Sequence, residues 1–364
     1  MQSTLKERRI IGLMSGTSLD GLDIAYCRFH ETKDIGVEFE LIAAETIEYP
    51  HPWVERLKNI EHSTALEYAL ADVELGHYFG RQVKGFIQRH PGHVDAIASH
   101  GHTVFHQPDR LLTTQIGDGD AIASECGLPV IFRFRNLDVA LGGQGAPLVP
   151  IGDQMLFGKY DGCLNLGGIG NISYNDPNGF RIAFDICVCN MLLNHLSNIV
   201  GLPYDKDGKL ACQGSVVNDV YQKMESLAYY QQMPPKSLGK EWFSENILTL
   251  LEVSPYSVTD LMRTSVEHIA NQIAQAIRQA DIKTLLVTGG GAKNRYLMQR
   301  LSEMSPQCAI ETTSQDTIDY KEAIIFALLG YLRLEGKNNC LSSVTGASRD
   351  CCGGVLTNPS ICTQ

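Results

Sequence analysis

Three glycine-rich segments of this sequence combine residue types that could hold a phosphate group. They read GLMSGTSLDGLD at residues 12–23, NLGGIGNIS at residues 165–173 and GGGAKN at residues 289–294. Glycine leaves backbone N–H groups uncovered, and neighbouring hydroxyls add donors, which together suit a phosphate. Each segment alone is also typical of a tight turn. The first is neither a Walker loop, which requires Gly-Lys-Ser/Thr, nor a GxGxxG fingerprint.

Three carboxylates near these segments suit metal binding or acid–base chemistry. Asp20 and Asp23 lie in the first segment and could belong to an Mg²⁺ shell through water. Asp185 follows an apolar residue between an expected strand and an expected helix. It could cap that helix or act as a general base at the edge of a cleft. From the local sequence alone, the cap is the preferred interpretation.

A histidine cluster, SHGHTVFH at residues 99–106, is a further candidate. His100, His102 and His106 would share one face of an extended segment, which suggests a metal at first sight. The cluster contains no Asp or Glu to complete a ligand set. We therefore interpret it as a source of contacts to sugar hydroxyls or phosphate. The sequence GGQGAP at residues 142–147 is expected to form a main-chain loop near a ligand.

The elements that would position these residues follow a pattern that occurs twice. A strand, a glycine turn and a second strand are expected over residues 8–29 and again over residues 163–174. This repeat, at the start of each half, predicts a duplicated α/β architecture. Further elements are expected as helices over 65–89, 257–280 and 323–332 and as strands over 94–99, 128–132 and 284–288.

Length and composition limit the class of protein. The chain has 364 residues, a net charge of −11 and 44% hydrophobic residues. This predicts a two-domain globular protein without a broad nucleic-acid surface. No apolar run approaches the roughly 18 residues of a membrane span. With no secretory signal in the first residues, we expect a cytoplasmic protein. The 11 cysteines are scattered, so we expect free thiols, and Cys187-x-Cys189 lacks a second pair at zinc-finger spacing.

Taken together, two glycine hairpins heading two halves and a third glycine turn are the parts of a two-domain ATP clamp. This layout resembles the actin, hexokinase and Hsp70 superfamily, in which two ribonuclease H-like domains close on a nucleotide cleft. We expect a first domain over residues 1–135 and a second over residues 136–350, with the tail 351–364 packing back on the first. The GGQGAP stretch is the expected crossing between them.

The chain more specifically resembles the anhydro-N-acetylmuramic acid kinase family, over residues 11–354. The matching stretches keep the family's order and separations, and the most specific are GLMSGTSLDG and GGQGAPLVP. Others are HGHTVFHQP, QIGDGDAIA, NLGGIGNIS, PYDKDGKLA, PKSLGKEWF, TGGGAKN, EAIIFALL and SVTGAS.

This resemblance implies an ATP- and Mg²⁺-dependent kinase of peptidoglycan recycling and amino-sugar metabolism, acting as a cytoplasmic homodimer. It implies conversion of 1,6-anhydro-N-acetylmuramic acid and water to N-acetylmuramic acid 6-phosphate. The family's water-activating base falls on Asp185, and the sugar-contacting stretches fall on Thr103, Arg135 and Glu322. The implied ATP-binding residues are Gly16, Thr17, Ser18, Leu19, Asp20, Gly21, Leu22, Asp23, Gly167, Gly168, Gly289, Gly290, Gly291 and Asn294.

Three departures from the family pattern bear on activity. Arg133 stands where the family usually has Asp, which reverses a charge beside the expected sugar site. Cys187-Val188-Cys189 replaces Gly-Pro-Gly, so Cβ atoms stand where glycines allow close approach and positive φ. His102 stands where Gln is common, a mild change because both bind hydroxyls.

Two alternative functions therefore stay open. Arg133 motivates a kinase of the same fold for another anhydro or amino sugar. The cysteine substitutions motivate a nucleotide-binding sensor that has lost the chemistry.

Overall fold

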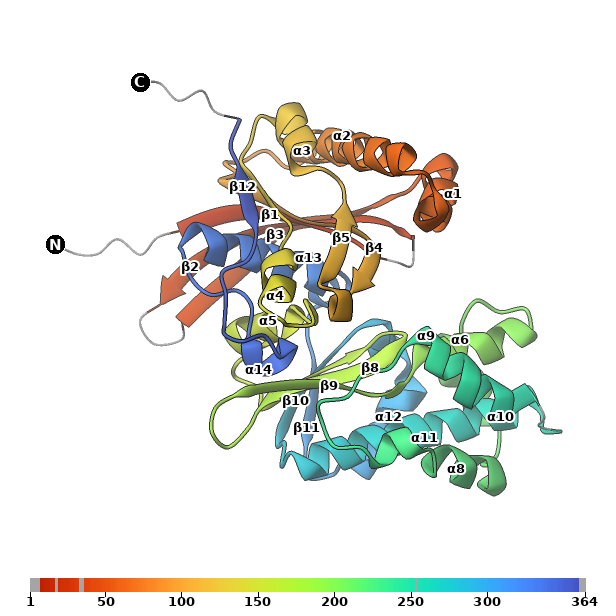
Figure 1. The fold of residues 1–364 in the computed structure, drawn as a ribbon. Helices are drawn as coiled ribbons and strands as arrows, with labels where there is room; N and C mark the ends of the chain where they lie inside the picture. Colours follow the sequence, from red (N-terminus) through yellow and green to blue (C-terminus); the bar gives the residue numbers. More distant parts are fainter. Residues whose placement is uncertain (1–6, 17–18, 33–35, 253–254, 360–364) are drawn as a thin grey trace. The chain divides into compact units, whose positions relative to one another are not determined.

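A computed structural model describes residues 7–16, 19–32, 36–252 and 255–359 (Figure 1). It divides the chain into two units. Unit 1 combines Met1–Leu156 with Tyr320–Gln364, and unit 2 is the continuous stretch Phe157–Asp319. This division differs from the one expected at residue 135. Residues 136–156 and 320–350 pack with residues 1–135 and therefore belong to unit 1. The GGQGAP stretch accordingly lies inside unit 1.

The sheet of unit 1 has the strand order β12-β6-β4-β1-β2-β3, with β5 paired to β4. Strands β1, β2 and β3 are antiparallel neighbours, whereas β4 and β6 run parallel to β1. The strand bounds are β1 Glu7–Ser15, β2 Gly21–Thr32, β3 Gly36–Glu48, β4 Ala96–Gln107, β5 Leu112–Ile116, β6 Val130–Phe132 and β12 Val355–Thr357.

Helices cover both faces of this sheet because successive strand residues point to opposite sides. Ile10 packs with the apolar residues of α13, whereas Ile11 packs with those of α2 and α3, and Figure 1 shows these helices on opposite faces. At Gly12 a Cβ would lie 1.9 Å from the carbonyl oxygen of Ala323, so the strand approaches α13 closely. The helices of unit 1 are α1 His51–Asn59, α2 Ala65–Arg89, α3 Gly119–Cys126, α4 Asn136–Ala140, α5 Val149–Leu156, α14 Ser342–Thr345 and α13 Gln315–Leu334, of which residues 320–334 belong to this unit.

The sheet of unit 2 has the order β11-β10-β7-β8-β9. Its strands β7, β8 and β9 are antiparallel neighbours, and β10 and β11 run parallel to β7. This repeats the order and directions of β6-β4-β1-β2-β3 in unit 1. The predicted duplicated α/β fold is therefore confirmed. The strand bounds are β7 Gly162–Leu166, β8 Ile169–Asn175, β9 Arg181–Val188, β10 Thr284–Thr288 and β11 Ala309–Thr312.

The core of unit 2 lies between this sheet and the long helix α11, whose N-cap is Ser257. None of the helices in the described ranges is long and apolar enough to cross a membrane. The helices of unit 2 are α6 Asn190–Ile199, α7 Lys209–Gln213, α8 Asn218–Glu225, α9 Lys240–Trp242, α10 Thr249–Glu252, α11 Val258–Gln279 and α12 Arg295–Met304. Short 3₁₀ segments span Ile60–His62, Pro108–Arg110, Lys206–Gly208, Ala228–Gln231 and Gly290–Lys293, and a π-helical segment spans Phe243–Leu248.

Candidate active site

A buried hydrogen-bond chain holds the start of the first glycine-rich segment in unit 1. The hydroxyl of Tyr49 donates to Ser15 Oγ at 2.7 Å, and Ser15 Oγ lies 2.9 Å from His102 Nδ1. Because Ser15 accepts from Tyr49, its own proton goes to His102, whose Nδ1 then accepts. Burial lowers the pKa of His102 to about 4, so the imidazole is neutral. The end of β1 is thereby fixed to β4.

The predicted nucleotide loop turns directly after Ser15. The N–H of Leu19 donates to the carbonyl of Gly16 at 3.3 Å, and Leu19 has a φ of 62°. A Cβ at Gly21 would lie 2.4 Å from the carbonyl oxygen of Ile47, so only glycine fits there. Thr17 and Ser18, two of the predicted ATP-binding residues, lie outside the described residues.

Three other residues of this loop have distinct surroundings. The side chain of Leu22 is fully buried in the core, so it packs against protein. Asp20 is exposed. Asp23 accepts a hydrogen bond from the hydroxyl of Thr46 at 2.6 Å. Carboxylate oxygens of this kind are suitable donors for Mg²⁺.

A second group in unit 1 surrounds Arg135, directly beyond β6. Its Nε donates to His100 Nε2 at 2.9 Å, and its Nη1 donates to the carbonyl of Gly145 at 2.7 Å. His100 Nδ1 lies 2.9 Å from the carbonyl of Gly101, so it carries the proton. Burial lowers the pKa of both Arg135 and His100. Nη2 of Arg135 donates to none of the described residues and is available to a ligand.

The remaining predicted sugar contacts are also in unit 1. Glu322 on α13 is solvent-accessible, yet desolvation by the surrounding protein raises the pKa of its carboxyl, an effect that the charge of Arg135 opposes. Thr103 is half-buried on β4. Arg133 is exposed, has a φ of 60° and places its guanidinium 5.4 Å from the ring centre of Phe132. Its charge therefore lies outside the Arg135 hydrogen-bond network.

The histidines do not form a common metal set among the described residues. His100 contacts Arg135 and His102 contacts Ser15, whereas His106 Nδ1 lies 3.1 Å from Thr113 Oγ1. The alternation expected for an extended segment is broken at Gly101, which has a φ of 77°.

In unit 2 the two other glycine-rich segments meet at the carboxyl ends of the parallel strands β7 and β10. At Gly289, with a φ of 82°, a Cβ would lie 2.6 Å from Asn165 Oδ1. A Cβ at Gly291 would lie 2.7 Å from that of Leu166, whereas one at Gly290 would have 3.7 Å to its nearest neighbour. The carboxyl ends of parallel strands are the usual ligand-binding edge of such sheets.

The turn Gly167-Gly168 belongs to the same edge. Its carbonyls accept from the N–H groups of Cys189, Asn190 and Met191 at 2.9–3.1 Å. Its own N–H groups find no acceptor among the described residues. Asn294, another predicted ATP ligand, uses its Oδ1 to accept from the N–H of Leu297 at 3.1 Å and so caps α12.

Asp185 lies within β9, so the helix-cap interpretation is wrong; the N-cap of α6 is Cys189. The N–H of Leu238 donates to Asp185 Oδ2 at 2.9 Å, and the hydroxyl of Tyr229 donates to the Asp185 carbonyl at 2.6 Å. Burial raises the pKa of this half-buried carboxyl, whereas the Leu238 bond lowers it. Oδ1 has no donor among the described residues. The carboxylate is thus oriented through one oxygen and available through the other.

The cysteines that replace the family's glycines fit without left-handed backbone. Neither Cys187 nor Cys189 has a positive φ, and Cys189 has a φ of −122°. Both side chains are buried in the core of unit 2. The positive φ considered from the sequence is therefore absent at these two positions, although Cys189, with a ψ of −103°, lies outside the usual α and β regions.

Sequence reasoning missed the residues that hold the site residues in place. Tyr49 lies 34 residues from Ser15, and Leu238 lies 53 residues from Asp185. No local pattern points to either contact.

The two units share one topology, and each has a glycine turn in its first hairpin. This combination defines a duplicated α/β protein of the actin and hexokinase class. The family model "Anhydro-N-acetylmuramic acid kinase" matches residues 8–359, and the chain belongs to that family.

Curated relatives match this chain along almost their whole length. The anhydro-N-acetylmuramic acid kinase of Vibrio cholerae is 37% identical, over 98% of this chain and 100% of that protein. The protein of the same name from Rippkaea orientalis is 36% identical, over 96% and 99%. Among solved structures, the activator of 2-hydroxyisocaproyl-CoA dehydratase from Clostridium difficile with bound ADPNP aligns with a TM-score of 0.42 and 11% identity, over 90% of this chain and 96% of that one. That distant likeness says nothing about function.

Proposed function

We propose that this chain is an ATP-dependent kinase that converts 1,6-anhydro-N-acetylmuramic acid and water to N-acetylmuramic acid 6-phosphate, with release of ADP. The family membership supports the sugar and the phosphoryl transfer. The observation that carries the mechanism is the carboxylate of Asp185, which is fixed through Oδ2 and open at Oδ1.

In this proposal Asp185 Oδ1 takes a proton from water. The water oxygen bonds to the anomeric carbon of the sugar as the bond from that carbon to O6 breaks. The freed O6 then bonds to the γ-phosphorus of ATP, and the bond to the β–γ bridging oxygen breaks to leave ADP. A raised pKa makes Asp185 a stronger base than an ordinary aspartate, which suits proton abstraction.

The glycine turns would hold the phosphates. The N–H groups of Gly167 and Gly168 are free to donate, and the open space at Gly290 lets a ligand approach the main chain. Asp20 and Asp23 would hold Mg²⁺ directly or through water, and the ion would neutralise phosphate charge. The pair fits the ion because both residues supply hard oxygen donors, Asp20 from the turn and Asp23 from the start of β2.

Contacts to the sugar are proposed for three residues of unit 1. Arg135 offers the free Nη2 donor to a carboxylate or hydroxyl, Glu322 offers an acceptor, and Thr103 offers a hydroxyl. The finer assignments taken from the family belong to the same proposal: a homodimer that works in the cytoplasm in peptidoglycan recycling.

The test combines an assay and one substitution. Purified protein with Mg-ATP should release ADP only when 1,6-anhydro-N-acetylmuramic acid is present, and mass spectrometry should find a sugar heavier by phosphate plus water. Asp185→Asn should lower kcat by about 10²–10⁴-fold, the usual contribution of a general base. It should leave ATP affinity unchanged, because an amide can still accept from Leu238.

Asp281→Asn is the matched control, because Asp281 is an exposed aspartate of unit 2 whose side chain is 84% exposed. It should retain full activity. Equal turnover in the two variants would contradict the role of Asp185. ATP binding with no sugar-dependent ADP release in the unsubstituted chain would instead favour a sensor.

A further inference from the structure

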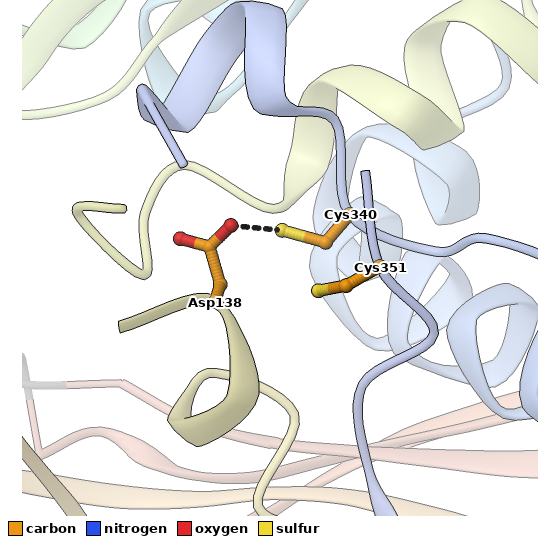
Figure 2. Close-up of side chains that lie close together, drawn as sticks. All are labelled: Asp138, Cys340 and Cys351. Carbon is orange, nitrogen blue, oxygen red and sulfur yellow. Dashed lines mark hydrogen bonds between the residues drawn. The ribbon is translucent and has the colours of Figure 1, made fainter. Parts of the chain in front are cut away.

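A second cluster of chemically active side chains lies in unit 1, close to the Arg135 group, whose guanidinium interacts electrostatically with Asp138. Figure 2 shows Asp138, from α4, beside Cys340 and Cys351, from two segments of the C-terminal part. The three side chains are buried, and their carboxylate oxygen and two sulfur atoms all lie within 4.8 Å of one another. Both thiols are free.

The backbone holds all three residues in place. Cys340 and Cys351 face each other across an isolated antiparallel bridge, with N–H to carbonyl distances of 3.1 and 3.2 Å. Asp138 Oδ2 accepts from the N–H of Gly145 at 2.7 Å. That bond leaves Oδ1 facing the sulfur of Cys340 at 3.1 Å. The carboxylate oxygen and the two sulfur atoms are therefore held close together by the backbone.

Among the described residues, no positively charged side chain donates a hydrogen bond to Asp138, and the charge of Arg135 acts on it only through space. The side chain of Asp138 is 0% exposed and is held by neutral donors: the N–H of Gly145, the hydroxyl of Thr345 at 2.7 Å and the thiol of Cys340. None of the ion pairs between described residues includes it. A buried carboxylate is stabilised far better by a cation than by neutral donors alone.

We propose that Asp138, Cys340 and Cys351 bind a thiophilic divalent cation of the zinc type. Two thiolates and a carboxylate are ligands that Zn²⁺ prefers, with Zn–S near 2.3 Å and Zn–O near 2.0–2.2 Å. Tetrahedral coordination at these lengths separates the sulfurs by about 3.8 Å and a sulfur from the oxygen by about 3.5 Å. The cluster reaches that geometry with side-chain shifts of about 1 Å or less.

Binding balances as an exchange of protons for the ion. The Cys340 thiol now donates its proton to Asp138 Oδ1. The ion replaces the protons of both thiols, so about two protons leave for each cation bound. Three protein ligands leave a fourth position for water.

The ion would connect distant parts of unit 1. It would join the segments around Cys340 and Cys351 to α4 and, through Asp138 Oδ2, to the loop at Gly145. The carbonyl of Gly145 accepts from Arg135. The metal site would therefore stabilise the loop that supports Arg135.

The experiment uses the full chain, reduced and stripped of metal, with Cd²⁺ and Zn²⁺ as probes. Cd²⁺ should produce the ultraviolet thiolate-to-metal charge-transfer band, saturating near one ion per chain with release of about two protons. Zn²⁺ should displace the bound Cd²⁺. X-ray absorption of the Zn²⁺-loaded protein should show two sulfur neighbours together with oxygen.

Substitutions assign the band to these residues. Cys340→Ser and Cys351→Ser should each abolish the saturating band. Cys352→Ser, at a half-buried neighbour outside the cluster, should keep it, as should Cys189→Ser in the other close cysteine pair. A band unchanged in Cys340→Ser and Cys351→Ser would overturn the site, and so would a Zn²⁺ spectrum without sulfur. The absorption measurement needs no variant, so a misfolded substitution does not leave the question open.

Discussion

At the scale of single residues, burial shifts two charged groups of the candidate site in opposite directions. It raises the pKa of the Asp185 carboxyl and lowers that of the Arg135 guanidinium. Arginine keeps its charge at neutral pH in any case because its ordinary pKa lies far above 7. Asp185 must lose its proton to act as a base, so its shift has kinetic consequences.

We expect kcat/KM to fall with decreasing pH through an apparent pKa above 3.8, the ordinary value for aspartate. The sign follows from the base role, since protonation removes the lone pair that accepts the proton of water. A pH–rate profile measures this limb. Asp281→Asn should leave the limb in place, and Asp185→Asn should abolish it. A limb at or below the ordinary aspartate value would contradict the raised pKa.

A substitution of Arg133 tests the alternative that the chain prefers another sugar. Because Arg133 is exposed and has a φ of 60°, which aspartate tolerates comparatively well, Arg133→Asp should change stability by no more than about 0.5 kcal/mol. We expect it to change the ratio of kcat/KM between the anhydro-muramic sugar and its analogues by about tenfold. Arg110→Asp is the control at another exposed arginine of unit 1. An unchanged ratio would remove the case for a shifted substrate.

At the scale of elements, the turn after β10 depends on glycine for two separate reasons. Gly289 and Gly179 have nearly equal φ angles, 82° and 84°, but only Gly289 faces neighbouring atoms within 4 Å. Gly179→Ala should cost about 1 kcal/mol for the left-handed backbone. Gly289→Ala should cost about 1–3 kcal/mol more, because its Cβ meets Asn165 and the Leu166 backbone. Denaturant unfolding measures both, and equal losses would argue against the close approach.

At the scale of the whole molecule, the two units differ in how the chain builds them. Unit 2 is one continuous stretch with its own sheet and core, whereas unit 1 needs α13 and β12 from the C-terminal part. A fragment of residues 157–319 should therefore unfold cooperatively when expressed alone. A fragment of residues 1–156 should not, because it lacks the apolar residues of α13 that cover Ile10. Circular dichroism with denaturant distinguishes the two fragments. Cooperative unfolding of the fragment of residues 1–156 would refute the dependence of unit 1 on the C-terminal part.

Local patterns in the sequence determined much of the architecture. The helix over 65–89 and the strand over 284–288 have the bounds predicted from apolar spacing, and both strand–turn–strand repeats are present. These features are predictable because side-chain period and glycine act over a few neighbouring residues. The motif matches likewise sufficed to recognise the family.

Tertiary structure alone decided which side chains act on each other. Asp185 is a strand residue oriented by Leu238, Ser15 is held by Tyr49, and Asp138 lies beside Cys340, 202 positions further along the chain. The chain also returns to unit 1 at Tyr320. Chain length alone suggests two domains that follow one another in the sequence. Such contacts depend on which elements pack together, and packing joins residues whose separation in sequence carries no periodic signal.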